Sequence, residues 1–267
     1  MGLFRPDYNR PGPGVRKDEP RKKGSRRFLE ILSRSLADLV KLNILFCICT
    51  LPTVAVFILG FAGFYPTAAF LLSLILAFPV GGAAVALVFC ISKMLRDDPG
   101  FIWPDFKRKF LENVKQASGP GIIFIAMIYS QVLLWYAYLF GGTGADYTWP
   151  LMTFVLFLII GMFMPYIFLL FAYIDLKASQ TIKNGILLSL ANIPRSFMGA
   201  VMGGVAWVAF FMFLPVSILF VPLIVIIGFS LTWLLTLMWV WPPVDKQFSI
   251  ETTIRDRQNH ANGETAG

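Results

Sequence analysis

Polar groups that could do chemistry are rare in the apolar stretches of this sequence, and Gln131 stands out among them. It lies beside Ser130 near the middle of a long apolar run. An amide in hydrocarbon needs a hydrogen-bond partner, so Gln131 predicts either a bond to a neighbouring helix or a contact with a ligand. Pro79, Gly81 and Gly82 interrupt a second apolar run. Such a break can free backbone groups for a ligand or a gate, and a kink that serves only packing is the alternative.

The residues that enzymes use are missing. The sequence has no HExxH, GxSxG or P-loop motif, and its one histidine, His260, is close to the C-terminus. Cys47, Cys49 and Cys90 lie in apolar runs and lack metal-ligand spacing. An acidic or basic residue that could couple transport to protons or sodium is also missing from these runs. We therefore expect no enzyme, with no catalytic residue, no metal site and no cofactor.

The composition indicates a membrane protein. The chain is 57% hydrophobic and 14% charged, whereas soluble domains are about 45–50% apolar and about 25% charged. Asp, Glu, Lys and Arg are absent from 42–92, 116–145, 147–174 and 196–244. Because a spanning helix needs roughly 20 apolar residues, these blocks predict an all-α fold with six transmembrane helices. We place the helices at about 36–60, 66–92, 121–140, 150–173, 197–216 and 221–241, with a break between Pro215 and Pro222 in the last block.

The charged segments predict the topology. Residues 1–24 form a basic, proline-containing tail that is expected to be disordered, and 243–267 form a polar C-terminal tail. With six crossings both ends lie on one side, together with the Lys and Arg of the connecting segments, which marks that side as cytoplasmic. The net charge of +8 then reports orientation and attraction to anionic lipid headgroups in the bilayer. Nucleic acid is not an expected partner, because no recognition helix or finger spacing is present.

The stretch DFKRKFLENVKQASGPG, residues 105–121, predicts an amphipathic helix on the inner membrane surface. Two further amphipathic stretches, Ser25–Leu42 and Ala178–Ile193, also precede outgoing helices. We therefore expect three hairpins, each preceded by a cytoplasmic amphipathic helix. The residues expected to form a surface for a partner or for lipid are Phe106, Lys107, Arg108, Lys109, Phe110, Asn113, Lys115, Asn192 and Arg195.

Gly199 and Gly203 form a GxxxG pattern, which lets two helices approach closely. The pattern favours packing within the monomer, and a homodimer is the alternative.

Several segments resemble one family. LNILFCICTLP (42–52), FPVGGAAVALVFCISKMLRDD (78–98) and WPDFKRKFLENVKQA (103–117) resemble the YesL family, which is grouped as domain of unknown function 624. IKNGILLSLANIPRSF (182–197) is similar to the second cytoplasmic block of that family. In many members a Leu-Pro-type motif leads almost directly into a Phe-Pro-type motif, whereas here 51–52 and 78–79 are far apart.

The resemblance implies a bacterial plasma-membrane protein linked to sugar metabolism, because members are often encoded beside carbohydrate uptake and degradation genes. It carries over no catalytic residue. We expect a non-enzymatic accessory or regulatory component of carbohydrate uptake, with components of a sugar ABC transporter as partners. One alternative is an uncoupled transporter of a small solute or lipid, and another is a structural, lipid-organising membrane protein.

Overall fold

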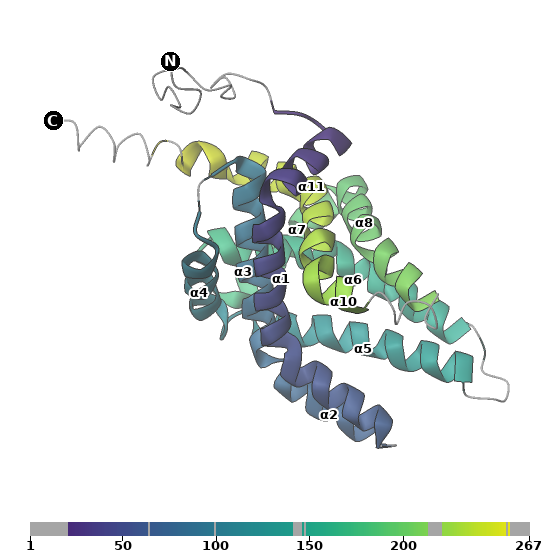
Figure 1. The fold of residues 1–267 in the computed structure, drawn as a ribbon. Coiled ribbons are helices and arrows are strands. Elements are labelled where there is room, and N and C mark those ends of the chain that lie inside the picture. The colour runs from purple at the N-terminus through teal and green to yellow at the C-terminus, as the bar shows by residue number, and fades with distance from the viewer. Residues whose placement is uncertain are drawn as a thin grey trace, which may run out of the picture.

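The computed structural model describes residues 21–63, 65–98, 100–140, 146, 148–212, 221–254 and 256, and these contain helices and no strand. Figure 1 shows their arrangement. The helices are α1 (Ser25–Ala62), α2 (Pro66–Leu76), α3 (Phe78–Arg96), α4 (Ile102–Asn113), α5 (Ser118–Phe140), α6 (Thr148–Tyr173), α7 (Ala178–Ala191), α8 (Ile193–Met212), α10 (Val221–Leu223), the π-helical η2 (Ile224–Gly228) and α11 (Phe229–Phe248).

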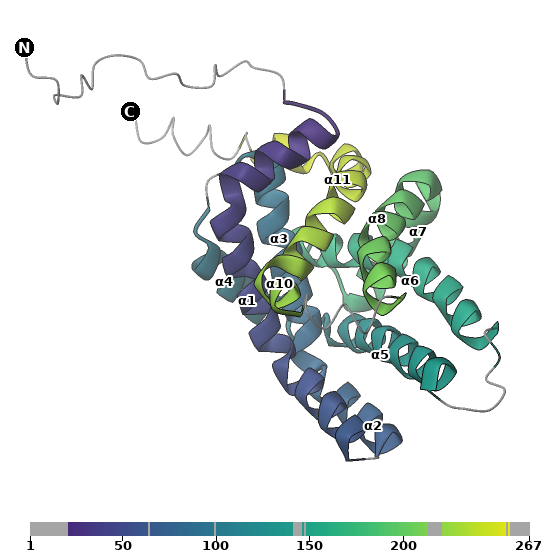
Figure 2. The same cartoon turned by 45° about the vertical axis from the view of Figure 1, so that its right-hand side comes forward.

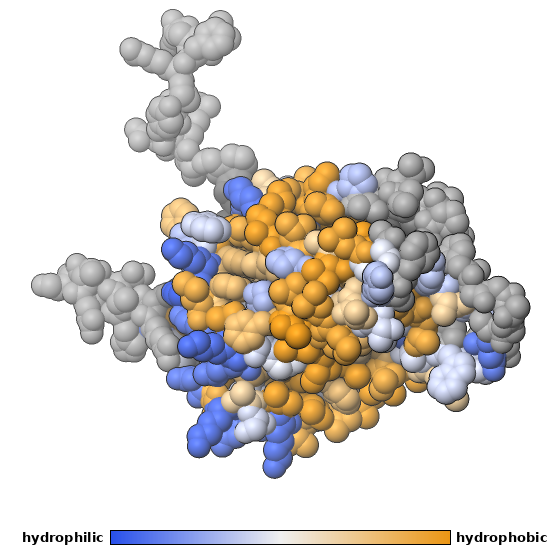
Figure 3. All heavy atoms as spheres, turned by 90° about the horizontal axis from the view of Figure 1, so that it is seen from below, coloured by the Kyte–Doolittle hydropathy of each residue, from blue (hydrophilic) through white to orange (hydrophobic). Residues whose placement is uncertain are grey.

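Several of these helices are long and apolar enough to cross a membrane. Within the described residues there are five such helices, or six if α7 and α8, which meet at a bend of 102°, are one span. The expected all-α fold with membrane-spanning helices is confirmed to this extent. Large apolar side chains are exposed along α1, α2 and α6, among them Ile58, Ile75 and Leu156. Figure 3 shows hydrophilic residues gathered along one side and broad hydrophobic surface beside them. Such exposed apolar area is typical of a protein surrounded by lipid.

α3 lies at the centre of the bundle. Every residue from Val80 to Ser92 is buried, and helices α1, α4, α5, α6 and α11 all pack against α3. The sequence GGAAVA at its start has small side chains. Because small residues let backbones approach closely without a hydrophobic driving force between helices, this segment suits the centre of a membrane bundle.

The expected helix 66–92 is two helices instead of one. α2 ends at Leu76 and α3 begins at Phe78, with Pro79 in its first turn. Proline has no backbone N–H to continue the preceding helix, so a helix starts here more easily than it passes through. α2 pairs with the end of α1, where a Cβ at Gly60 would overlap the Cβ of Ala69. α3 is 19 residues long and is by itself long enough to span.

α1 joins two expected elements in one kinked helix. Its backbone is non-helical at Ser35, with φ −113° and ψ 19°. Figure 2 shows the first turns angled away from the rest of α1. The kink therefore falls inside the expected amphipathic stretch Ser25–Leu42 and directly before residue 36, where the first crossing is expected to begin.

α4 folds back along α3. Lys93 on α3 forms an ion pair of 2.7 Å with Asp105 in the first turn of α4. At the other end, a Cβ at Gly82 would lie 2.8 Å from the Cα of Val114, just after α4. α4 is thus antiparallel to α3 and packed against it along its length.

α7 lies along α6 in the same way. Ser189 Oγ donates to the carbonyl of Met162 at 3.0 Å. A Cβ at Gly185 would lie 2.7 Å from Cγ1 of Ile167. The amphipathic helices predicted at 105–121 and 178–193 therefore both run back along the helix that precedes them.

The C-terminal region differs from the expected polar tail. α11 continues through Pro242 and Pro243 to Phe248, and Ile250 beyond it is buried in the core. Helix 197–216 is observed as α8 up to Met212. The predicted break spans residues 215–222, most of which lie outside the described residues, as do residues 1–20 of the predicted N-terminal tail and the end of the C-terminal tail.

Candidate functional site

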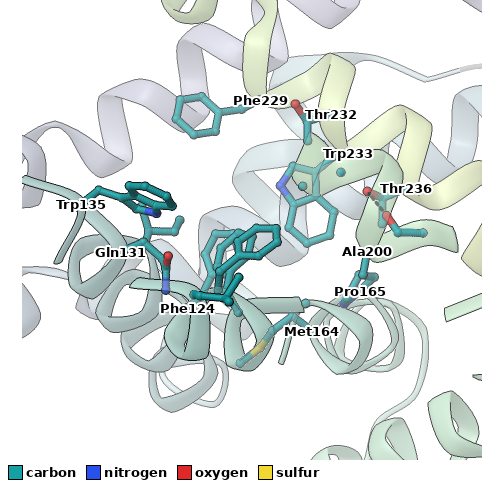
Figure 4. Close-up of a pocket in the computed structure, with 18 residues that line it drawn as sticks. Phe124, Gln131, Trp135, Met164, Pro165, Ala200, Phe229, Thr232, Trp233 and Thr236 are labelled. Carbon is teal, nitrogen blue, oxygen red and sulfur yellow. Dashed lines mark hydrogen bonds between the residues drawn. The ribbon is translucent and has the colours of Figure 1, made fainter. Parts of the chain in front are cut away.

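A cavity of about 260 Å³ lies between α5, α6, α8 and α11. Its walls are mainly aromatic and aliphatic side chains, with Phe124 and Trp135 on α5, Phe157 on α6 and Trp233 on α11. Figure 4 shows Gln131 and Trp135 on one side and Thr232, Trp233 and Thr236 on the other. The cavity therefore has an apolar body with a few polar groups, which is typical of a site for a small molecule.

The glycine-rich face of α8 makes room for the cavity. A Cβ at Gly204 would have no neighbour closer than 3.6 Å, and one at Gly161 of α6 none closer than 3.8 Å. Gly199 and Gly203 are different, since both lie tight against α11. A Cβ at Gly203 would be 2.5 Å from Thr236 Oγ1, and one at Gly199 would be 3.0 Å from Cγ2 of Val240. The structure thus places the predicted packing pair against a helix of the same chain.

Gln131 lines the cavity and carries an unpaired acceptor. The residue is 5% exposed, and within the described part of the chain its Oε1 atom has no hydrogen-bond partner. Buried polar side-chain atoms are nearly always paired, so this oxygen needs an explanation. The interhelical hydrogen bond that was one interpretation of Gln131 is not made by Oε1.

The two threonine hydroxyls in the wall are already used. Thr232 Oγ1 donates to the carbonyl of Gly228 at 2.7 Å, and Thr236 Oγ1 donates to the carbonyl of Gly199 at 3.2 Å. A hydroxyl has a single donor proton. Neither threonine can therefore donate to Gln131 without giving up its backbone bond.

A distant residue of α1 fixes the α11 wall. Asn43 is completely buried, and its Nδ2 donates to the carbonyls of Ile224 at 3.0 Å and Val225 at 2.6 Å. Its Oδ1 accepts from the backbone N–H of Ser230 at 2.9 Å. The π-helical turn of η2 breaks the regular ladder, and Asn43 pairs with two carbonyls of this turn and with a backbone N–H just beyond it. Phe229, which begins α11 and lines the cavity, follows directly after η2.

The break predicted in the second apolar run, at 79–82, lies apart from this cavity. A Cβ at Gly81 would overlap the carbonyl oxygen of Ala117, and one at Gly121 would overlap the backbone nitrogen of Gly81. The backbone beside Gly82 is likewise filled by Val114. Gly81 and Gly82 therefore contact the segment that joins α4 to α5, and Pro79 lies in the first turn of α3, in the packing arrangement that the sequence left as the alternative. The structure does not bring them together with Gln131.

The predicted partner surface is divided between two faces of α4. Phe106 and Asn113 are buried, so they form no exposed surface, because the apolar face of this amphipathic helix turns to α3. Phe110 packs partly buried against the core, and Lys109 is partly exposed. Lys107, Arg108 and Lys115 are exposed, and so is Arg195 at the start of α8. Asn113 and Asn192 each donate to the carbonyl four residues earlier in the chain.

Charged side chains gather at one end of the molecule. Arg27, Arg34 and Arg21 all contact the carboxylate of Asp97, at 2.6, 2.6 and 3.2 Å. Burial would raise the pKa of Asp97, but hydrogen bonds from Arg27 and Arg34 outweigh it and hold the pKa below its ordinary value. Arg21 also pairs with Glu251 at 2.7 Å. This ionic cluster ties the start of α1, the end of α3 and the C-terminal region together.

These features define a class, a helical protein with several membrane-spanning helices and an apolar cavity between four of them. Among the described residues no group of His, Cys, Asp and Glu side chains could hold a metal ion. No family model, curated protein or solved structure matches the chain, so the resemblance to the YesL family stays an expectation.

The sequence singled out three of the residues that line the cavity, Gln131 as a polar group and Gly199 and Gly203 for helix packing, and missed most of the others. Gln131 was noticed because an amide is unusual in an apolar run. Trp233, Thr236 and Gly204 gave no separate signal, although Gly204 lies beside the GxxxG pattern on the edge that turns away from α11.

Proposed function

We propose that this chain is a non-enzymatic, multi-pass membrane protein that binds a small, mainly apolar molecule between α5, α6, α8 and α11, as an uncoupled carrier does. The cavity carries the proposal. At about 260 Å³ it is larger than the engineered apolar cavity of about 150 Å³ that holds benzene. By that comparison it suits a molecule of about ten non-hydrogen atoms.

The character of the lining supports binding without ion coupling. Among the described residues that line the cavity, none is Asp, Glu, Lys, Arg or His. The ionisable side chains Arg27, Lys93, Arg96 and Asp97 gather at the far end of α3 and the start of α1. Proton- or sodium-coupled transport needs an ionisable group or ion ligands along the path. A carrier built on this cavity would therefore move its ligand down a concentration gradient.

A cavity-filling variant tests the proposal. Gly204→Leu adds a side chain where a Cβ meets only ordinary contacts, so the leucine enters the cavity. Gly119→Leu is the matched control, because a Cβ at Gly119 has nothing within 4 Å. We expect 1-fluoronaphthalene to bind saturably to the wild type and to Gly119→Leu, measured by ¹⁹F NMR in detergent micelles, and binding to weaken at least tenfold in Gly204→Leu. Equal, non-saturable partitioning into all three samples would exclude a binding cavity.

The topology belongs to the same proposal. The ion pair between Arg21 and Glu251 supports placing both ends of the described chain on one side of the membrane. The abundance of Lys and Arg at that end supports the cytoplasmic side of a bacterial plasma membrane. A tag on Gly267 should therefore stay unreactive toward an impermeant reagent in intact cells and react after lysis. Labelling in intact cells would reverse the orientation.

A second candidate is an accessory role in carbohydrate uptake, which the resemblance to the YesL family favours. Lys107, Arg108 and Lys115 offer an exposed basic face for a cytoplasmic partner such as a sugar ABC transporter component. Reproducible recovery of such a component in mild detergent, lost when Lys107 and Arg108 are changed to Glu, would support it. Recovery of no transporter component would count against it.

The same face also fits a lipid-organising role. Trp103 and Leu111 are each 60% exposed beside Lys107 and Arg108, a mixture typical of helices at the membrane interface. If this role holds, changing Lys107 and Arg108 to Glu should reduce co-purification of anionic lipid. Unchanged retention of anionic lipid would contradict a lipid-organising role for this basic face.

A further inference from the structure

We infer that the molecule bound in the cavity carries a hydrogen-bond donor, a hydroxyl or an amide N–H, that pairs with Oε1 of Gln131. The inference rests on the proposed function, because it names the class of ligand for the same cavity. The ligand is thus a small alcohol or amide with an apolar body, and neither a pure hydrocarbon nor an ion.

The argument begins with the cost of an unpaired acceptor. Gln131 is 5% exposed, and its Oε1 has no partner among the described residues. An amide oxygen enclosed by apolar side chains loses its bonds to water without receiving others. A ligand that donates one hydrogen bond repairs this loss, whereas an apolar ligand of the same shape leaves it in place.

Among the described residues, the hydroxyl groups nearest to Gln131 are committed elsewhere. The hydroxyl of Thr232 is committed to Gly228 and that of Thr236 to Gly199. Ser130, the neighbour of Gln131, donates to the carbonyl of Met127 in its own helix at 2.8 Å. Oε1 of Gln131 is therefore open to a donor on a molecule that enters the cavity.

The walls describe the rest of the ligand. The ring of Trp233 lies 6.1 Å from that of Phe124 and 5.8 Å from that of Phe168, so one side of the cavity is an aromatic cluster. Aromatic walls favour a planar or aliphatic body through dispersion and edge contacts. An ionised group has no counter-charge among the described lining residues and would be expelled by its desolvation cost.

A pair of isomers tests the inference. 3-(4-Fluorophenyl)propan-1-ol and 1-fluoro-4-(2-methoxyethyl)benzene have the same atoms, but only the alcohol has a donor. We expect the alcohol to bind the wild-type protein about fivefold more tightly than the ether, the size of one net hydrogen bond. Affinities are measured by ¹⁹F NMR, with Gly204→Leu in the same micelles as the reference for partitioning.

Variants of Gln131 locate the effect. Gln131→Met keeps the length of the side chain and removes the acceptor, so it should lose the preference for the alcohol and retain its affinity for the ether. Ser130→Ala, the matched control, should keep the preference for the alcohol.

The outcomes separate the two proposals. Equal affinity of the wild type for both isomers, or a preference for the alcohol that survives in Gln131→Met, would overturn the inference that the ligand donates a hydrogen bond to Gln131. Saturable binding of neither isomer would contradict the proposed function instead. The wild-type comparison needs no variant, so the inference can be tested even if Gln131→Met fails to fold.

Discussion

Asn43 should contribute more to the free energy of unfolding than a residue with a single hydrogen bond. Asn43→Leu keeps the approximate size of the residue and removes three hydrogen bonds, two to carbonyls in η2 and one from the N–H of Ser230. Hydrogen bonds between membrane helices average about 0.6 kcal/mol, which sets a lower limit of about 2 kcal/mol for three. Stranding buried groups without partners costs about 1–3 kcal/mol each. We expect a total loss of about 2–4 kcal/mol.

Asn192→Leu is the matched control, because the same chemical change removes one bond within the helix's own last turn. It should cost less than about 1 kcal/mol. Unfolding in mixed micelles of mild detergent and dodecyl sulfate, followed by helical circular dichroism, measures both variants. A difference of less than about 0.5 kcal/mol between them would refute the reasoning, since the three bonds would then contribute nothing beyond a local one.

A second measurement checks the link to the cavity. Asn43 does not line the cavity, but it holds the turn that precedes Phe229 and Trp233. Asn43→Leu should therefore weaken binding of the fluorinated alcohol, while Asn192→Leu leaves it unchanged. Unaltered binding in Asn43→Leu would show that the α11 wall keeps its position without this clamp.

Further predictions concern three other sites. Gly81→Ala should destabilise the protein by several kcal/mol while Gly119→Ala changes stability by less than about 0.5 kcal/mol in the same unfolding assay, because only the first places a Cβ on backbone atoms. Gln131→Met should stabilise the ligand-free protein by about 1–2 kcal/mol, since it removes a buried unpaired acceptor, and a loss of stability would contradict that account. The folded-state pKa of Asp97 is lowered, so its stabilising effect should be complete above its unfolded-state pKa of about 4 and be lost as pH falls through the lower folded value. Asp97→Asn, which tolerates the left-handed backbone at φ 63°, should remove that pH dependence of unfolding, and an unchanged pH profile would assign it to another group.

The positions of the long helices follow from charge patterning, and their interruptions do not. α5 and α6 match their predicted ranges closely because Gly119–Gly121, Tyr173 and the charged residues beyond them mark the ends. An interruption was predicted at Pro79, Gly81 and Gly82, close to the observed break at Ala77, but within a single helix 66–92. The apolar run is continuous at Ala77, and hydropathy alone cannot separate one long helix from two. The pairing of α2 with α1 and of α3 with five other helices decides it, and those contacts are long-range.

The candidate site was predictable only in its polar member Gln131 and in the packing glycines Gly199 and Gly203. Gln131 differs in kind from its neighbours, so the sequence alone indicates that it needs a partner. The cavity around it depends on how far α8 stands from α6, a distance that no local pattern encodes. Asn43 shows the same limit, since it resembles Asn113 and Asn192 in sequence context but bonds to the backbone of another segment of the chain, whereas they bond to the backbone of their own helix.

The contacts around the cavity explain why it stays open. Lipid tails are as apolar as the side chains of the helices, so no hydrophobic force pushes membrane helices together. Close packing and polar bonds therefore determine the distances between helices. α11 is held on one edge by Asn43 and on the other by Thr236, whose hydroxyl bonds to the backbone of Gly199. Gly203 fits so tightly beneath Thr236 that α8 cannot slide toward α6 without breaking this contact. The space at Gly204 and Gly161 is therefore maintained by polar contacts at the rim, and weakening the rim should close the cavity more readily than changing its apolar walls.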